Sequence, residues 1–283
     1  MKCIIWDVEH GSASFIVTPS GRTFAVDLGV GSYHDSDDSF SPLLHLKRNG
    51  VSQLDAVILT HPHRDHIDDI HNFDALAPKL LVTAAHLTEQ EIRAENRSTD
   101  QPIIDKYLEI LRRYNAPAPP SASHPFTAQN NGGVEVKCFV PSVCARTNLN
   151  NHSVVTVFSY AGFKLLIPGD NEPPSWDELL KKLDFIEAIK DTDVLVAPHH
   201  GRESGFSANL FKTINPRITI ISDGRFCDTS ATSRYSGNSR GWKIHKRGGG
   251  SESRNCLTTR SDGTITVEFG TNSDGRYLEI TVD

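Results

Sequence analysis

The stretch "VILTHPHRDHIDDIHNF", residues 57–73, joins an apolar run to an unusual density of histidine and aspartate. Its first part, "VILT", has the composition of a buried strand, and the imidazole and carboxylate groups begin directly at its end. Such groups are costly to bury unless they are paired or coordinate a metal. The stretch therefore predicts either a solvated polar loop or one part of a metal site whose remaining ligands come from elsewhere in the chain.

The spacing inside "HPHRDH" favours the metal site. Residues two apart in an extended chain project to the same side, so His61 and His63 can reach one cation. Asp65 and His66 lie a step further along the chain and can reach a second cation. Neutral imidazole and carboxylate are suitable ligands for zinc and similar divalent ions.

Further candidate ligands stand at the ends of other apolar segments, where loops can converge. "FKLLIPGD" ends with Asp170, a group suited to bridging two cations, and "VLVAPHHG" carries His199 and His200. "NNHS" offers His152, and "TFAVDLG" offers Asp27 for a hydrogen bond that orients a ligand histidine. Together with "HPHRDH", these residues predict a dinuclear centre.

Length and composition are those of one large α/β domain. The chain has 283 residues, of which 37% are hydrophobic and 23% charged. No apolar run approaches the roughly 20 residues of a membrane-spanning helix, and acidic residues interrupt the N-terminal segment, which does not resemble a signal peptide. The five cysteines form no CxxC pair, which favours a reduced, cytoplasmic protein without membrane association.

The charge of the chain is unevenly distributed. Residues 215–260 carry nine Lys/Arg against three acidic residues, a net +6 in a chain whose overall charge is −6. A basic segment on an acidic protein suggests an anionic partner, and a solvated loop is the alternative. The Ser/Gly/Arg-rich composition predicts a basic, irregular insert at about 225–255 in a single domain that covers residues 1–283.

Twelve short apolar segments bounded by turn residues predict strands at 2–7, 14–18, 23–27, 54–60, 79–84, 134–140, 153–160, 163–168, 193–198, 217–222, 264–269 and 277–282. Four segments with helical periodicity or end signals predict helices at 42–50, 102–116, 172–190 and 207–215. This order of elements predicts an α/β fold with two β-sheets and helices outside them.

"HPHRDH" resembles the HxHxDH signature of the metallo-β-lactamase fold, and Asp27, His61–His66, Asp170 and His199/His200 follow the order of that superfamily's motifs. Four blocks resemble, more narrowly, the metallo-β-lactamase domain of ComEC-type competence proteins: "DVEHGSASFIVTPSGRTFAVDLG", "NNHSVVTVFSYAGFKLLIPGD", "VLVAPHHGRESG" and "TTRSDGTITV". The resemblance spans almost the whole chain. It implies a four-layer αββα sandwich and a hydrolase with two divalent metals, most often acting on phosphate esters.

The chain departs from the ComEC-type pattern at several positions. Asp68 and Asp69 replace a Gly-Gly pair, His10 replaces a glutamine, and Tyr235 alone remains of a later block with Tyr and His-Pro. The membrane helices of ComEC proteins are missing, so we expect a stand-alone hydrolase with no implied role in DNA uptake.

The resemblance and the residue chemistry together assign roles. His61 and His63 would bind the first metal, Asp65 and His66 the second, and Asp170 would bridge them. One of His199 and His200 would complete the second site, while the other contacts substrate or protonates the leaving group; these two and Asp65 are the candidate catalytic residues. His152 is either a ligand of the first metal, or a substrate contact or bystander. Zinc is the expected metal and manganese the alternative.

Three further residues are candidates for substrate binding. His10 lies in the opening loop, and Arg202 and Ser204 follow the histidine pair. Arginine suits bidentate contact with phosphate. The alternative is a loop leading into a helix, with Ser204 or Ser207 as the N-cap.

The expected activity is that of a phosphodiesterase on a nucleotide or nucleic acid, in which a hydroxide formed between two metals attacks phosphorus. Residues 215–260 contain few aromatic residues for stacking bases, so a small anionic nucleotide is as consistent with the sequence as a polymer. One alternative is hydrolysis of a carbonyl bond in an amide, lactone or thioester at the same site. The other is a non-catalytic, metal-stabilised binding or accessory module.

Overall fold

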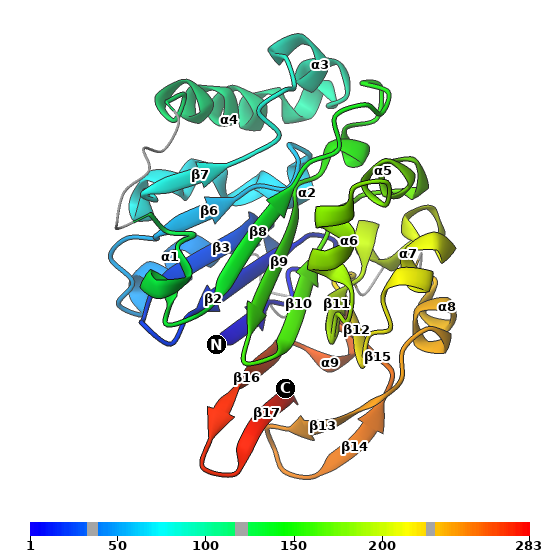
Figure 1. Ribbon diagram of the computed structural model, residues 1–283. Helices are drawn as coiled ribbons and strands as arrows, with labels where there is room; N and C mark the ends of the chain where they lie inside the picture. The colour runs from blue at the N-terminus through cyan, green and yellow to red at the C-terminus, as the bar shows by residue number, and fades with distance from the viewer. Residues whose placement is uncertain (33–38, 117–123, 225–229) are drawn as a thin grey trace.

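The computed structural model describes residues 1–32, 39–116, 124–224 and 230–283. Two large β-sheets dominate it (Figure 1). The nine-stranded sheet has the order β14 (Ser251–Arg254), β13 (Trp242–Lys246), β17 (Gly275–Val282), β16 (Ile265–Asn272), β1 (Lys2–Ile5), β2 (Ala13–Val17), β3 (Thr23–Leu28), β6 (Ala56–Ile58) and β7 (Leu80–Val82). The six-stranded sheet has the order β15 (Cys256–Thr258), β12 (Ile218–Ile221), β11 (Val194–Val196), β10 (Phe163–Ile167), β9 (Val155–Tyr160) and β8 (Glu135–Phe139).

The two sheets pack face to face, with helices on both outer surfaces. Side chains alternate along β3: Phe24 and Val26 enter the core between the sheets, whereas Ala25 faces outward. The helices α1 (Pro42–Arg48) and α4 (Gln101–Arg113), with the 3₁₀ segment η1 (Asp68–Leu76), cover the outer face of the nine-stranded sheet. The helices α5 (Pro173–Leu179), α6 (Leu183–Ile189) and α7 (Ala208–Thr213) cover the six-stranded sheet. The four-layer αββα sandwich is therefore confirmed.

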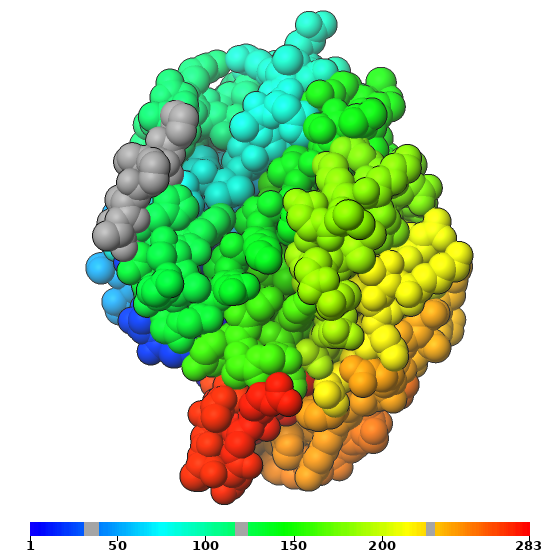
Figure 2. All heavy atoms as spheres, in the orientation of Figure 1, coloured from blue at the N-terminus to red at the C-terminus, as the bar shows by residue number. Residues whose placement is uncertain are grey.

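The smaller elements connect these layers. They are the strand pair β4 (Gly31–Ser32) and β5 (Ser39–Phe40), the helices α2 (Arg64–Ile67), α3 (Glu89–Ala94), α8 (Thr232–Gly237) and α9 (Thr259–Asp262), and the 3₁₀ segments η2 (Ser98–Asp100), η3 (Ala128–Asn131), η4 (Leu149–His152), η5 (Pro198–Gly201) and η6 (Glu203–Gly205). On the face shown in Figure 2, the hairpin of β16 and β17 projects beyond the rest of the sandwich. No helix in the described ranges has the length and apolar character that crossing a bilayer requires.

Parallel pairing determines where the loops of interest meet. β3, β6 and β7 run parallel in one sheet, and β10, β11, β12 and β15 run parallel in the other. The carboxyl ends of parallel strands lie at one edge of a sheet, and ligands bind outside such edges in open α/β sheets. The segments that follow β3, β6, β10, β11 and β12 therefore emerge at such edges.

All twelve predicted strands are present, most of them with shortened ends. The single helix predicted at 172–190 is instead two helices, α5 and α6, because Lys182 adopts an extended conformation between them. The prediction of an irregular insert at 225–255 is wrong over its described part: α8, β13 and β14 lie there, and residues 225–229 lie outside the described residues. Within β13, Ile244 is fully buried in the core between the sheets, and Trp242 packs against that core.

Candidate metal centre

Buried imidazole and carboxylate side chains from both sheets meet at the strand ends. His61 and His66 follow β6, Asp170 follows β10, and His200 follows β11, and each of these four side chains is buried. Asp65 lies in α2, directly before His66, and completes the cluster. A cluster of this composition has the donor chemistry of a site for divalent cations.

The donor atoms of the larger group have the spacing of metal ligands. His66 Nε2 lies 3.1 Å from Asp170 Oδ1 and 3.2 Å from His200 Nε2. His200 Nε2 lies 3.3 Å from Asp65 Oδ2 and 3.5 Å from Asp170 Oδ2. Tetrahedral coordination with bonds near 2.1 Å separates neighbouring ligand atoms by about 3.4 Å. His66, His200 and Asp170 therefore fit a shared divalent cation, and Asp65 adjoins them through His200.

A second group of donors lies on the other side of Asp170. His61 Nε2 is 3.0 Å from His63 Nδ1 and 3.9 Å from Asp170 Oδ2. Asp170 thus faces both groups, which is the position that a bridging carboxylate requires.

Hydrogen bonds at Nδ1 orient the imidazoles of His66 and His200, whose Nε2 atoms face the other donors. Asp27 Oδ2 lies 2.8 Å from His66 Nδ1, and the same carboxylate accepts hydrogen bonds from the backbone N–H and the hydroxyl of Thr60. His200 Nδ1 lies 3.0 Å from the carbonyl oxygen of Ser222. Such partners fix the ring orientation and the tautomer of a metal-binding histidine.

Left-handed backbone conformations shape three of these positions. Asp27 has φ +59°, His199 φ +49° and His200 φ +51°. This region is uncommon for residues other than glycine, and strained residues of this kind cluster at functional sites. The two side chains diverge: His200 joins the buried donors, and His199 faces the cleft.

The charges in the cluster are strongly coupled. Burial and the neighbouring His66 lower the pKa of His61 well below its ordinary value. Burial also opposes protonation of His66, but the carboxylates of Asp170, Asp27 and Asp65 outweigh it and raise the pKa of His66 well above its ordinary value. Burial alone would raise the pKa of Asp170, yet His66 and His200 hold it well below. Coordination of a cation through its ring nitrogen would require the neutral form of His66.

Arg202, His10 and His199 line the open side of the cluster. Arg202 Nη2 donates to His10 Nε2 at 3.0 Å, and Arg202 Nη1 lies 3.5 Å from His199 Nε2.

His199 Nδ1 lies 3.1 Å from Glu172 Oε1 and 3.0 Å from Ser204 Oγ, and its Nε2 is 3.8 Å from Asp170. Burial, followed by the charge of His200, lowers the pKa of His10 to about 4. The three residues expected to bind substrate, His10, Arg202 and Ser204, therefore lie near the metal cluster. Ser204 contacts His199 rather than the cluster itself.

His152 is not brought into either ligand group. It ends the turn η4, and its ring nitrogens approach the carbonyl oxygens of Pro141 and Ala145 at 3.3 Å each. His86 Nε2 lies 3.0 Å from His152 Nδ1. The prediction that His152 binds metal or substrate is corrected here, because its nitrogens face the backbone and a second imidazole. Asn150, two residues earlier, lines the cleft instead.

The two aspartates that follow the motif have structural partners. Asp69 is buried and accepts hydrogen bonds from Ser41 Oγ, the backbone N–H of Leu43 and the amide of Asn72, so it fixes the start of α1. Asp68 forms an ion pair with Arg64 at 3.2 Å and lines the cleft.

The cleft above the cluster has a volume of ≈ 650 Å³. Its lining combines His63, Asp170 and His199 with the side chains of Arg64, Arg97 and Arg202. None of the described residues of the basic segment 215–260 lines it. Six basic side chains of that segment instead form ion pairs, namely Arg217, Arg234, Lys246, Arg247, Arg254 and Arg260.

Three contributors to the site were not singled out from the sequence. Thr60 precedes the motif and donates to Asp27. Glu172 follows Asp170 by two residues and contacts His199, and Ser222 follows β12 and contacts His200. Of the three, Glu172 could most readily have been predicted from the sequence, because it is an acidic residue just beyond the strand end that carries Asp170.

This chain is similar to several known proteins. ComE operon protein 3 of Bacillus subtilis (strain 168) is 24% identical over 233 residues, which are 77% of this chain and 28% of that protein, so the chain spans little more than a quarter of this relative. The structure of Zn(2+)-bound PqqB from Methylobacterium extorquens is 13% identical, with a TM-score of 0.49, over 95% of this chain and 100% of that one. Human tRNase Z, short form, is 14% identical, with a TM-score of 0.40, over 78% of this chain and 91% of that one.

The match to ComE operon protein 3 agrees with the ComEC-type blocks identified in the sequence. The family model described as "Metallo-beta-lactamase superfamily" matches residues 6–221, well over half of the chain. The chain therefore belongs to the metallo-beta-lactamase superfamily, as its motifs predicted.

Proposed function

We propose that this protein is a dinuclear metal-dependent phosphodiesterase that acts on a nucleotide or nucleic acid. Members of the superfamily are mostly metal-dependent hydrolases, and the two donor groups that share Asp170 support two divalent cations. Their His and Asp donors suit zinc best, with manganese as the alternative.

The observation that carries the choice of a phosphate substrate is the environment of Arg202. Its guanidinium contacts two imidazoles, and its Nε is buried without a hydrogen-bond partner. Within the described part of the chain, no carboxylate lies within ion-pair distance of it. Arg202 is a half-buried cation in the cleft lining without a paired carboxylate, so this site favours an anionic ligand. Arginine is the side chain best matched to phosphate oxygens.

The metal cluster and the cleft residues Arg202 and His199 would have separate roles in hydrolysis. Two cations in this cluster would lower the pKa of a shared water and offset charge on the reacting phosphate. Arg202 would bind a non-bridging phosphate oxygen. His199 Nδ1 is held by Glu172, which leaves Nε2 as the atom that can exchange a proton with a substrate oxygen.

The cleft favours a substrate of nucleotide size. Its volume of ≈ 650 Å³ lies within the range of about 300–1,000 Å³ found for small-molecule sites. The basic segment that would attract a polymer is largely neutralised by its own ion pairs and does not line the cleft. We therefore expect cyclic or short linear phosphodiesters to be better substrates than long duplexes.

A substrate screen of the purified, metal-loaded protein tests the proposal. The panel is bis-p-nitrophenyl phosphate, cyclic nucleotides, single- and double-stranded DNA and RNA, and a lactone. Wild type should hydrolyse phosphodiesters, Asp170→Asn should not, and Arg202→Ala should raise KM while retaining both metals. Hydrolysis of the lactone alone would overturn the phosphodiesterase proposal in favour of carbonyl chemistry. No hydrolysis by protein that holds two metals would favour a binding module.

A further inference from the structure

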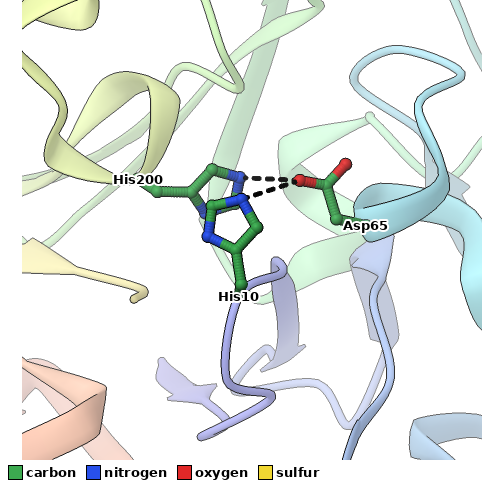
Figure 3. Close-up of side chains that lie close together, drawn as sticks. All are labelled: His10, Asp65 and His200. Carbon is green, nitrogen blue, oxygen red and sulfur yellow. Dashed lines mark ion pairs between the residues drawn. The ribbon is translucent and has the colours of Figure 1, made fainter. Parts of the chain in front are cut away.

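Three side chains from separate segments converge at the mouth of the centre (Figure 3). His10 lies in the loop between β1 and β2, Asp65 in α2, and His200 in η5. The Nε2 atoms of His10 and His200 lie 3.6 Å and 3.3 Å from the same oxygen, Asp65 Oδ2. The two imidazole rings lie side by side, with 4.6 Å between their centroids.

This geometry is that of a ligand set. The two distances are close to the separation of about 3.4 Å between neighbouring ligand atoms in a tetrahedral zinc site. The donor atoms of His10, Asp65 and His200 lie within 4.8 Å of one another, as a common cation requires. A substrate contact would require only that His10 face the cleft, and would not require that it share a carboxylate oxygen with His200.

The loop that carries His10 is fixed to the two other members of the set. The backbone N–H of Ser12 donates to the carbonyl oxygen of Asp65 at 3.1 Å. Ser222 Oγ donates to the carbonyl oxygen of Gly11 at 2.6 Å, and the carbonyl oxygen of Ser222 faces His200 Nδ1. The approach is close, because a Cβ on Gly11 would lie 2.9 Å from the Asp65 carbonyl oxygen. His10 is therefore positioned by the same contacts that position Asp65 and His200.

Arg202 determines whether His10 Nε2 is available. Its Nη2 donates to that nitrogen, so the guanidinium and a cation compete for one lone pair. Two positive groups cannot share it, and a cation at Asp65 and His200 would repel the guanidinium. When the guanidinium moves away, its donors become free to face an anion in the cleft.

We propose that His10 is a protein ligand of the second cation, with Asp65 and His200, and that metal binding transfers Arg202 from His10 to the substrate. This inference rests on the dinuclear site of the proposed function. It adds a ligand and couples metal occupancy to the arginine that would bind phosphate.

The test measures metal binding without substrate. Metal-free wild type, His10→Ala, Arg202→Ala and a surface control, His245→Ala, are titrated with Zn²⁺ against a competing chelator. His10→Ala should lose at least tenfold in affinity for one of two cations and keep the other unchanged. Arg202→Ala should bind the second cation as tightly as wild type or more tightly, and His245→Ala should match wild type. Equal unfolding temperatures of the metal-free proteins would exclude misfolding.

Counting imidazoles gives an independent readout. In Mn²⁺-loaded protein, pulsed EPR detects the nitrogen atoms bound to the metal, and His10→Ala should remove one imidazole from the second site. An unchanged imidazole count, or unchanged affinity for both cations, would overturn the ligand assignment and leave the phosphodiesterase proposal standing. An equal loss of affinity in Arg202→Ala would also overturn it, because His10 would then act through the arginine. Wild type that binds both cations but cleaves no phosphodiester would overturn only the proposed function.

Discussion

Asp27 is the residue on which the orientation of His66 depends most directly. Its carboxylate holds the His66 ring and Thr60 from a left-handed backbone position that asparagine also tolerates. Asp27→Asn therefore removes the charge without straining the chain. We expect affinity for one of the two cations to fall about 10–100-fold, as it does when partners of metal-bound histidines are lost. Chelator competition with Zn²⁺ measures this directly.

Asp55→Asn is the matched control for that substitution. Asp55 is a buried carboxylate directly before β6, and it accepts hydrogen bonds from the backbone N–H of Thr23 and from Arg22 and Lys79. Its loss should lower stability and leave metal affinity unchanged. Equal effects of the two substitutions on metal affinity would show that Asp27 has no specific role in orienting His66.

At the residue scale, the sequence predicted donor chemistry better than side-chain direction. The motif of His61, His63, Asp65 and His66 and the distant Asp170 all reach the centre, since each follows a strand whose composition is clear. His152 was misjudged because a single turn decides where its ring points. The choice between His199 and His200 could not be made, because left-handed conformations of histidine are imposed by tertiary contacts rather than by local pattern.

At the scale of elements, Glu178 ties α5 to the loop after β8, and it makes stability depend on pH. Burial would raise the pKa of Glu178, but hydrogen bonds from the backbone N–H groups of Ser142 and Val143 outweigh it and lower that pKa. A depressed carboxyl pKa stabilises the fold above the unfolded-state value of about 4.3, and this contribution disappears as pH falls through the folded-state pKa.

Glu178→Gln should therefore unfold at lower urea concentration than wild type at pH 7. The difference in unfolding free energy should shrink as the pH falls below about 4.3. Urea denaturation at intervals from pH 7 to acid measures it. A difference that stays constant over this range would mean that the charge of Glu178 contributes nothing.

Trp176 anchors the helical layer over the six-stranded sheet. Its side chain is fully buried, and its Nε1 donates to the carbonyl oxygen of Asn171, next to the candidate ligand Asp170. Trp176→Ala should cost about 3–5 kcal/mol of unfolding free energy through the cavity and the lost contacts. Trp176→Phe should cost distinctly less, and chemical denaturation compares the two. Similar losses would indicate that the hydrogen bond to Asn171, rather than packing, dominates.

Two errors in the predicted elements have different causes. β13 and β14 lie in a Ser/Gly/Arg-rich segment, where the alternation of inward Trp242 and Ile244 with outward Lys243 and His245 was obscured by its charge. The helix pair α5 and α6 was predicted as one because the apolar spacing continues through the turn at 180–182. Alternation and periodicity predict whether a segment is a strand or a helix more reliably than they predict where that element is interrupted.

At the scale of the whole molecule, metal removal should destabilise both sheets together. A ligand that binds only the folded state adds RT ln(1 + [L]/Kd), which is about 2.7 kcal/mol at one hundred times Kd. Treatment with a chelator should therefore lower the Tm by several degrees, and added Zn²⁺ should restore it. Differential scanning calorimetry of metal-free and reloaded protein measures the shift. An unchanged Tm would mean that the centre binds cations too weakly to be occupied.

The origin of the donors affects how variants of this protein are interpreted. Asp27 lies in β3 and His61 and His66 follow β6 of the nine-stranded sheet, whereas Asp170 and His200 follow strands of the six-stranded sheet. Bonds near 2.1 Å tolerate little relative sliding of the two sheets. A substitution in the core between them can thus empty the centre without touching a ligand. Cation occupancy consequently reports the alignment of the two sheets, and a metal-poor variant identifies a lost ligand only when its metal-free fold matches that of wild type.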